Sequence, residues 1–327
     1  MGPCMSAAKE SGPKARAVVF GATGKQGGSV VDALLKEGKY EVVAVTRSAE
    51  SEKAKALVTK GASVVEADMG DKAACQAAVQ GADFVFLVTQ FWEKFDQDLE
   101  EQEGKNVIDA CKDGKVGFLV FSTLEDISAL NEAGMSCGKI EPLESGKIVP
   151  HFDGKGRAMA YCKESGVKAA YLKLSFYMDN WNGPMMQIKP SEDGKFTLSY
   201  PLQGHPMGLV AVEDTGAMVA ALFKNADKYA GKEIGAAGDV LTGEEIVAVF
   251  SEVFGKTVEW ADVEVAAFKA YGFPGAGEFG NMFQAYQDLE KLPRSVEETK
   301  ALYPGTKDLK TFLTENKDSE FFADLNA

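Results

Sequence analysis

Short apolar runs rich in β-branched residues recur along the first half of the chain. They cover residues 17–20, 41–46, 62–67, 84–89, 117–121 and 167–176. Each gap between two runs contains a segment with helical periodicity, such as residues 29–38, where Val30, Val31 and Leu34 share one face. Strands joined by crossovers of this length pair in parallel. The pattern therefore predicts an α/β fold of the Rossmann type, with a doubly wound parallel sheet.

Two helices of this half have clear end signals. Asp71 is placed to cap a helix over residues 72–80. A second helix over residues 96–112 has basic residues near its end and acidic residues at its start, namely Asp96, Asp98, Glu100 and Glu101. We assign these acidic residues to the positive end of the helix dipole. Residues 128–150 lack any periodicity and are rich in Gly, Ser, Glu and Lys, which predicts a long mobile loop beside the ligand-binding side of the sheet.

The second half is less regular. It predicts a loop over residues 178–194, short strands over 195–200 and 258–260, and helices over 212–224, 242–254, 279–289 and 307–316. Asp214 is the expected cap of the first of these helices, and Thr242 with Glu245 forms a capping-box pattern. In the helix over 279–289, Phe283, Tyr286 and Leu289 share a face.

These elements suit a smaller mixed α/β lobe above the carboxyl ends of the parallel strands, where ligands bind in open sheets. We therefore expect a flexible tail over residues 1–15, a Rossmann domain over 16–177 and the smaller lobe over 178–327. In this division, the Rossmann domain and the smaller lobe can both contribute strands to the same sheet.

The composition narrows the possible functions. The 327 residues carry a net charge of −14 without a basic block, so direct nucleic-acid binding is not expected. No apolar run is long enough to cross a membrane. Five cysteines, an odd number without a Cys-x-x-Cys motif, indicate reduced thiols in the cytoplasm, with the nucleus as a further location. A redox-sensing role of Cys137 or Cys162 is the alternative.

The first apolar run leads into a glycine-rich turn, Gly21-Ala22-Thr23-Gly24-Lys25-Gln26-Gly27, and then into a helix. Such a turn allows backbone N–H groups to approach a pyrophosphate, and the helix N-terminus adds positive potential. The alternative is a tight turn with a purely structural role. The strand before the turn and the amphipathic helix after it favour dinucleotide binding.

The residues after the second and third runs would meet the adenosine half of a dinucleotide. Arg47 lies 20 residues beyond Gly27, where arginine accommodates the 2′-phosphate of NADP(H). Lys53 would add positive potential there. Asp68 and Met69 follow the third run, at the place of an adenine contact. The competing interpretation of Asp68 is a cap for the next helix.

A reductase of this architecture commonly uses Ser, Tyr and Lys, with Tyr and Lys one helical turn apart so that both face the nicotinamide. Ser122 ends the fifth run and Lys155 is present, but the tyrosine position holds His151. Lys155 is therefore expected to bind the cofactor. His151 is a candidate acid in a reductase and otherwise has a structural or lid role. Tyr161 lies almost on the opposite helix face and should not substitute.

Other chemistries lack support. The chain has only two histidines, His151 and His205, and its cysteines do not cluster, so no metal site is expected. No Gly-x-Ser-x-Gly motif indicates a hydrolase.

The glycine turn, Val45-Thr46-Arg47 and His151-Phe152-Asp153-Gly154-Lys155-Gly156 together resemble the NmrA-like family, whose members have an atypical short-chain dehydrogenase/reductase fold. The similarity runs from about residue 17 to the C-terminus. The resemblance implies NADP(H) ligands at Gly21, Ala22, Thr23, Gly24, Lys25, Gln26, Arg47, Thr89, Gln90, Phe91, Lys155, Tyr177, Met178, Asp179 and Asn180. A lysine that the family carries after Trp92 falls near Gln102 here, and the loop over 128–150 is longer than in the family.

The resemblance also implies a regulator without dehydrogenase activity, which changes shape, oligomeric state or partner with NADPH occupancy. Its partners would be transcription factors or metabolic enzymes, with a homodimer or a dimeric scaffold as alternatives. The competing hypothesis is an NADPH-dependent reductase of quinones or carbonyl compounds, with Lys155, His151 and Ser122 as catalytic residues. Its planar substrate would lie among aromatic residues, namely Phe91, Trp92, Tyr177 and Trp181.

Overall fold

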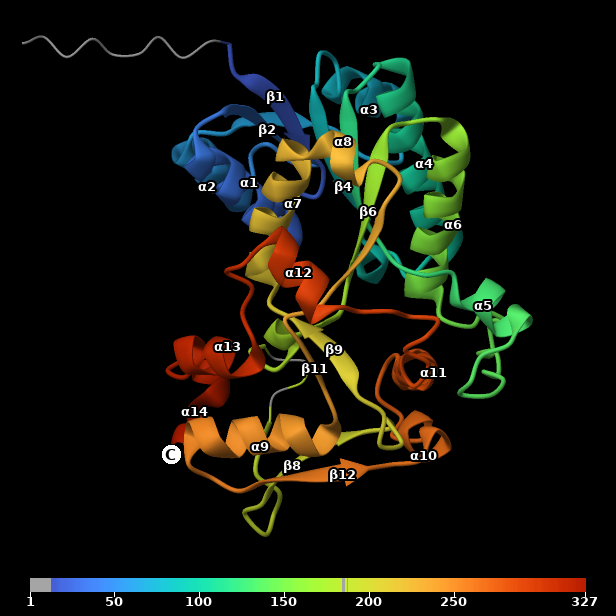
Figure 1. Cartoon of the computed structure of the whole chain (residues 1–327), viewed down its shortest axis with the longest axis vertical. Helices are drawn as coiled ribbons and strands as arrows, with labels where there is room; N and C mark the ends of the chain where they lie inside the picture. Colours follow the sequence, from blue (N-terminus) through green and yellow to red (C-terminus); the bar gives the residue numbers. More distant parts are fainter. Residues whose placement is uncertain (1–12, 184–185, 187) are drawn as a thin grey trace, which may run out of the picture.

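The structure, a computed structural model, describes residues 13–183, 186 and 188–327. Seven strands of these residues form one parallel sheet in the order β3-β2-β1-β4-β5-β6-β10 (Figure 1). They are β1 (Ala15–Val19), β2 (Tyr40–Thr46), β3 (Ser63–Glu66), β4 (Phe84–Val88), β5 (Phe118–Thr123), β6 (Ala169–Leu174) and β10 (Glu233–Ala236). The order reverses its direction between β1 and β4, which is where such sheets bind ligands. The predicted α/β fold is confirmed.

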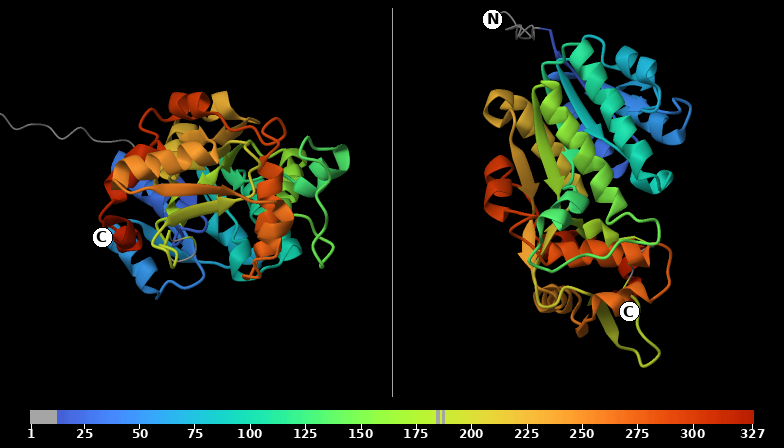
Figure 2. Two further views of the ribbon diagram at one scale, coloured as in Figure 1. Left: turned by 90° about the horizontal axis from the view of Figure 1, so that it is seen from below. Right: turned by 90° about the vertical axis from the view of Figure 1, so that its right-hand side faces the viewer.

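Both faces of this sheet are covered by helices because both sets of alternating side chains are apolar. Val18 and Phe20 face one helical layer, formed by α3 (Lys72–Ala78), α4 (Gln97–Asp113) and α6 (Pro150–Ser165). Val19 faces the other layer, formed by α1 (Lys25–Glu37), α2 (Glu52–Lys60) and α7 (Thr215–Lys224). The right-hand view of Figure 2 shows α4 and α6 side by side.

Two elements from the second half of the chain return to this sheet. Strand β10 pairs with β6, and α7 packs against α1 (Figure 1). The approach of the two helices is close, because a Cβ at Gly216 would lie 2.0 Å from the Ser29 carbonyl oxygen. The small helix α8 (Ala226–Tyr229) borders α7 and β6, and the small helix α12 (Val296–Leu302) borders α7 and β10.

The remaining elements form a second lobe at the carboxyl ends of the parallel strands (Figure 1). Its core contains Trp181, Phe250, Phe283 and Phe312, all fully or almost fully buried. Its strands are β7 (Phe176–Tyr177), β9 (Met207–Val210) and β11 (Asp239–Leu241) in one sheet, and β8 (Phe196–Tyr200) and β12 (Val258–Asp262) in another. Its helices include α9 (Gly243–Phe254), α10 (Val265–Lys269), α11 (Ala276–Tyr286), α13 (Leu309–Asn316) and α14 (Ala323–Asn326), with the 3₁₀ turns η2 (Met178–Asn180), η3 (Val212–Asp214) and η4 (Glu320–Phe322). The smaller mixed lobe is as expected.

Three local predictions can be compared directly with the structure. The capping box of Thr242 and Glu245 is confirmed. Asp214 does not cap α7; its buried carboxylate instead accepts the backbone N–H of Lys307, which lies just before α13, at 2.8 Å. Leu289 lies beyond the end of α11 and does not continue its face.

The segment over 128–150 is not a loop throughout, so that prediction is wrong in part. Helix α5 (Ile127–Ala133) extends into it. The Asp126 side chain accepts the N–H of Ala129, and Ile127 is fully buried, which together fix this short helix.

Among the described residues no helix has the length and apolarity needed to cross a membrane. The four described cysteines form no disulfide. Residues 1–12, which include most of the expected tail and Cys4, lie outside the described part.

Candidate functional site

The glycine turn lies between the carboxyl end of β1 and helix α1, beside β4. Gly21 has a φ of +69°, a region that L side chains rarely adopt. A Cβ at Gly27 would lie 2.2 Å from the Gly21 carbonyl oxygen, so only glycine allows α1 to start this close to the turn. Both glycines are therefore required by the backbone.

The N-terminus of α1 carries no capping side chain and no acidic residue in its first turn. Its cap residue is Gly24, whose N–H donates to the Gly21 carbonyl at 2.9 Å. Lys25 adds a positive charge beside these backbone groups. A diphosphate fits this chemistry, because it would supply the oxygen acceptors that a capping side chain supplies in other helices.

Gln26 connects this turn to the ends of two other strands. Its amide Nε2 donates to the Tyr177 hydroxyl oxygen at 2.6 Å, and its Oε1 accepts from the Ser122 hydroxyl at 2.6 Å. Burial raises the pKa of Tyr177 to about 12, so the phenol stays protonated. The structure thus brings together three residues that the sequence assigned separately.

Lys155 on α6 lies next to Thr89, at the end of β4. Its Nζ donates to the Thr89 hydroxyl at 3.2 Å and to the Thr89 carbonyl at 3.3 Å. It also forms an ion pair with Glu100 of α4, whose side chain is buried, while that of Lys155 is largely covered. The lysine charge at this position is therefore already compensated by the protein.

Glu100 is the main site residue that sequence analysis missed. The sequence assigns it to the helix dipole, but it is 2% exposed, and its Oε2 has no hydrogen-bond partner among the residues that the structure describes. The helix periodicity of this segment indicates that Glu100 lies on the buried face. Glu100, Glu103, Val107 and Cys111 recur at helical spacing on the buried face of α4.

His151 lies one turn before Lys155 but does not face an open cleft. Its Nδ1 lies 2.5 Å from Oε1 of Glu278, and its ring packs on Trp92 with centroids 4.8 Å apart. The side chain is 9% exposed. Glu278 comes from α11 and was not predicted, since no local pattern relates it to α6. Tyr161, as expected, lies elsewhere, with its hydroxyl donating to Asp109.

Arg47 is held by an acidic residue that follows β4. Its two terminal nitrogens contact the two carboxylate oxygens of Glu93 at 2.7 and 2.9 Å. Glu93 ends the 3₁₀ turn η1 (Phe91–Glu93), which Gln90 precedes. Lys53 on α2 is exposed. The guanidinium at the end of β2 is thus placed near the β4 loop, as a dinucleotide site requires.

The turn after β3 is fixed by its own side chains. Asp71 caps α3 as predicted, so the interpretation of Asp68 as the cap is wrong. The Asp68 carboxylate instead accepts the Gly70 N–H at 2.7 Å, and the Met69 carbonyl accepts from Asn106 of α4. The adenine contact of this turn stays a prediction.

The segment after Tyr177 turns toward the second lobe. The Met178 side chain is fully buried in that lobe's core, and the Asp179 carboxylate accepts the Val212 N–H at 2.9 Å. Asn180 is partly buried. Trp181 is fully buried and donates to the Tyr200 hydroxyl, so its predicted place in an aromatic substrate pocket is wrong.

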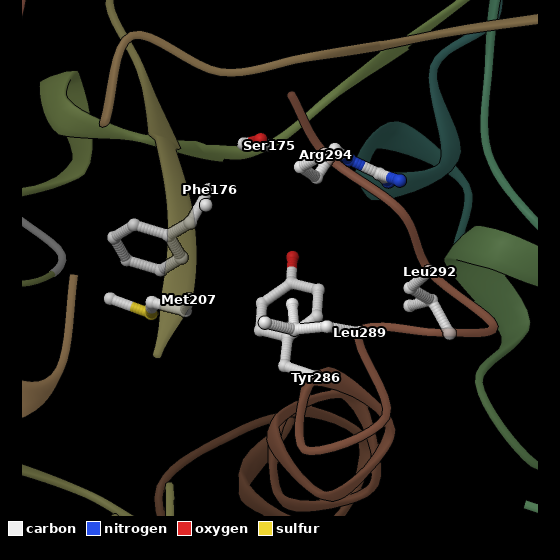
Figure 3. A pocket seen from close by; sticks show the side chains of 8 residues that line it. Ser175, Phe176, Met207, Tyr286, Leu289, Leu292 and Arg294 are labelled. Atoms are coloured by element: carbon white, nitrogen blue, oxygen red, sulfur yellow. The ribbon is translucent and has the colours of Figure 1, made fainter. Parts of the chain in front are cut away.

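A cavity lies beside this segment (Figure 3). Its volume is about 10 Å³, enough for about one water molecule. It is lined by Ser175, Phe176, Met207, Gly208, Tyr286, Leu289, Leu292 and Arg294. The Tyr286 hydroxyl points into it without a hydrogen-bond partner among the described residues. Arg294 binds Glu125 through two hydrogen bonds of 2.8 and 3.1 Å. In the described part of the chain no acidic, His or Cys cluster could hold a metal.

A comparison with protein families decides the affiliation. The NmrA-like family matches residues 13–313. The chain belongs to this family. The predicted resemblance is confirmed at this level.

Individual relatives include both regulators and enzymes. An NmrA-like family domain-containing oxidoreductase of Aspergillus campestris is 30% identical over 270 residues, 76% of each chain. The crystal structure of NmrA, a negative transcriptional regulator, in complex with NADP has a TM-score of 0.77 at 18% identity, covering 94% of this chain and 99% of NmrA. An NADPH-dependent quinone oxidoreductase from Escherichia coli in complex with NADPH has a TM-score of 0.72 at 22% identity, covering 92% and 100%.

Proposed function

We propose that the protein is a non-catalytic NADP(H)-binding regulator that responds to the NADPH level. The observation that carries this proposal is the burial and pairing of the His151 side chain. His151 occupies the position at which a reductase of this fold has its proton donor. Its Nδ1 is paired with Glu278 and its ring is covered by Trp92, so it has no open path to a substrate. Lys155, its partner position, is neutralised by Glu100.

The cofactor assignment rests on the glycine turn and on Arg47. The diphosphate would lie on the N-terminus of α1, and Arg47 would bind the 2′-phosphate. Thr89, Lys155 and Tyr177 would position the nicotinamide half. A bound NADPH can supply a hydride in an enzyme. In the proposed regulator, the fraction of protein molecules with bound nucleotide is what sets the conformation.

A regulator of this kind needs two conformations that bind the nucleotide with different affinities. Its partner would be a transcription factor or a metabolic enzyme, in the cytoplasm or also the nucleus. The relative named as a negative transcriptional regulator supports this partner class. A homodimer is the alternative, and light scattering with and without NADPH distinguishes the two.

The test measures thermal stability with NADPH, NADP⁺, NADH and NAD⁺, because a ligand of the native state raises its melting temperature. The phosphorylated nucleotides should give the larger increases, and Arg47→Ala should remove this preference. Lys36→Ala, which removes an exposed lysine from the last turn of α1, is the matched control. Equal increases with NADH would contradict the role of Arg47.

A second candidate, an NADPH-dependent reductase of quinones or carbonyl compounds, is supported by the similar fold of the NADPH-dependent quinone oxidoreductase and by the Tyr286 hydroxyl. This phenol has no hydrogen-bond partner among the described residues and can donate a proton to a carbonyl oxygen, and the small space beside Phe176 must widen to admit such a substrate. The assay follows NADPH absorbance with a panel of quinones and aldehydes. Turnover that is lost in both Tyr286→Phe and Lys155→Ala would replace the regulator proposal.

A further inference from the structure

The guanidinium that we assign to the 2′-phosphate already has an anionic ligand from the same chain. Glu93 places both carboxylate oxygens against the two terminal nitrogens of Arg47. This is the two-point geometry with which arginine also binds a phosphate. The pair is accessible, since the side chains of Arg47 and Glu93 are 55% and 43% exposed.

We propose that Glu93 is a specificity-determining residue that competes with the 2′-phosphate for Arg47. This inference rests on the proposed NADP(H) function. A phosphate that binds the two terminal nitrogens of Arg47 displaces the Glu93 carboxylate, which occupies both of them. Once displaced, the carboxylate is repelled by the phosphate and moves away from it. NADH lacks this phosphate and leaves the pair intact.

The contacts of the residues next to Glu93 determine which part of the chain moves when its carboxylate is displaced. Lys94, the next residue, is held to α4 by an ion pair with Glu103 at 2.6 Å. Phe95 then has a φ of +53°, a strained value for a phenylalanine, and its side chain is largely exposed. The ion pair of Lys94 and the buried ring of Phe91 hold the chain on the two sides of Glu93, so the displacement falls on the Glu93 side chain and on Trp92, its neighbour in η1.

Trp92 in η1 connects this movement to the second lobe. Its ring stacks on Phe279 of α11 with centroids 5.2 Å apart and 15° between the planes. It also covers His151, which is bonded to Glu278 of α11. Release of Glu93 thus loosens the contact between the β4 loop and α11 only when the nucleotide carries a 2′-phosphate.

The first experiment measures NADPH and NADH affinities by calorimetry for the wild type, Glu93→Gln and Glu50→Gln. Glu50 is a matched control, because it follows β2 near Arg47 but contacts only Lys55, at 3.7 Å, with its side chain 90% exposed. Glu93→Gln should tighten NADPH binding about fivefold, the upper range for an exposed ion pair, and leave NADH unchanged. Glu50→Gln should change neither affinity.

Two results would overturn the competition. One is unchanged NADPH affinity in Glu93→Gln, and the other is an equal gain in Glu50→Gln, which would reflect net charge alone. A failure of the proposed NADP(H) function would give a different result in the same experiment. In that case the wild type itself would not prefer NADPH over NADH, whatever Glu93 does.

The second experiment tests the movement of η1 without the nicotinamide half. The protein is labelled with 5-fluorotryptophan, and the Trp92 resonance is assigned with Trp92→Phe. Adenosine 2′,5′-bisphosphate should shift the Trp92 resonance and leave that of the buried Trp181 in place, whereas 5′-ADP should shift neither. A bound 2′,5′-bisphosphate that leaves Trp92 unshifted would refute the displacement.

Discussion

Lys155 of α6 and Glu100 of α4 form an ion pair whose side chains are only 13% and 1% exposed. The pair connects the two helices on one face of the sheet at the end of β4. A buried charge without its partner is strongly unfavourable, so each residue stabilises the protein mainly by compensating the other.

Replacement of Glu100 should therefore destabilise the fold. We expect Glu100→Gln to lower the free energy of unfolding by about 3 kcal/mol, because it leaves the Lys155 ammonium uncompensated. Glu101→Gln is the matched control, since Glu101 pairs with Lys105 one helical turn away, with side chains 19% and 30% exposed, and its replacement should cost about 0.5 kcal/mol or less. Urea titrations measure both, and equal losses would argue against a special role of the buried pair.

Two adjacent glycines of α1 should respond in opposite ways to alanine. Gly27→Ala should lower stability by about 2 kcal/mol or more and abolish NADPH binding, because its Cβ would lie 2.2 Å from the Gly21 carbonyl oxygen. At Gly28 the nearest atom, the Ala22 carbonyl oxygen, would be 3.6 Å away, so alanine should stabilise by about 0.5 kcal/mol or more. Thermal melts and calorimetry check both, and a tolerated Gly27→Ala would contradict the geometry of the turn.

Asp214 predicts a specific dependence of stability on pH. Burial raises its pKa from 3.8 to about 6. Between about pH 4 and pH 6 the native state thus retains a proton that the unfolded state releases, so this group lowers stability as the pH rises. Asp214→Asn keeps an acceptor for the Lys307 N–H and should exceed the wild type by roughly 2 kcal/mol at about pH 7.

That difference should shrink as the pH falls toward about 4, where both states of the wild type hold the proton. Denaturant titrations across this range measure it. A difference that does not vary with pH would mean that Asp214 does not titrate in the native state as its burial implies.

The four cysteines in the described part of the chain should react slowly in the native protein. Burial raises the pKa of Cys75 to about 12 and of Cys162 to about 11, and it also raises the pKa of Cys111 and Cys137. Since the thiolate is the nucleophile, little of it is present at neutral pH. In timed alkylation followed by peptide mapping, partly buried Cys137 should react first. Rapid labelling of Cys162 would revive the redox-sensing alternative.

The repeating architecture was predictable because its signals are local. Each strand before β6 corresponds to an apolar run in the sequence. The glycines at positions 21, 24 and 27 by themselves indicate a tight turn with unusual backbone angles. The acidic partners of the site were not predictable in the same way. Glu93, Glu100 and Glu278 occupy positions that also suit an exposed helix start, and only the tertiary structure shows which cation each one meets.

The same limit explains two errors. Asp214 has the sequence position of a helix cap, but its carboxylate binds a backbone N–H from residue 307, far along the chain. Trp181 follows a segment assigned to the cofactor, yet one direction change in η2 places its ring in the lobe core. Sequence neighbours predict local hydrogen bonds well and the burial of a side chain poorly.

The return of α7 and β10 to the parallel sheet has a consequence for any attempt to divide the molecule. A fragment that stops at residue 177 would leave the edge of β6 without its hydrogen-bonded neighbour and the apolar flank of α1 open to water. An unpaired strand edge and an exposed apolar helix face both favour association with other chains. The amino-terminal half would then aggregate on its own, and the intact polypeptide would lose both lobes in a single cooperative melting event.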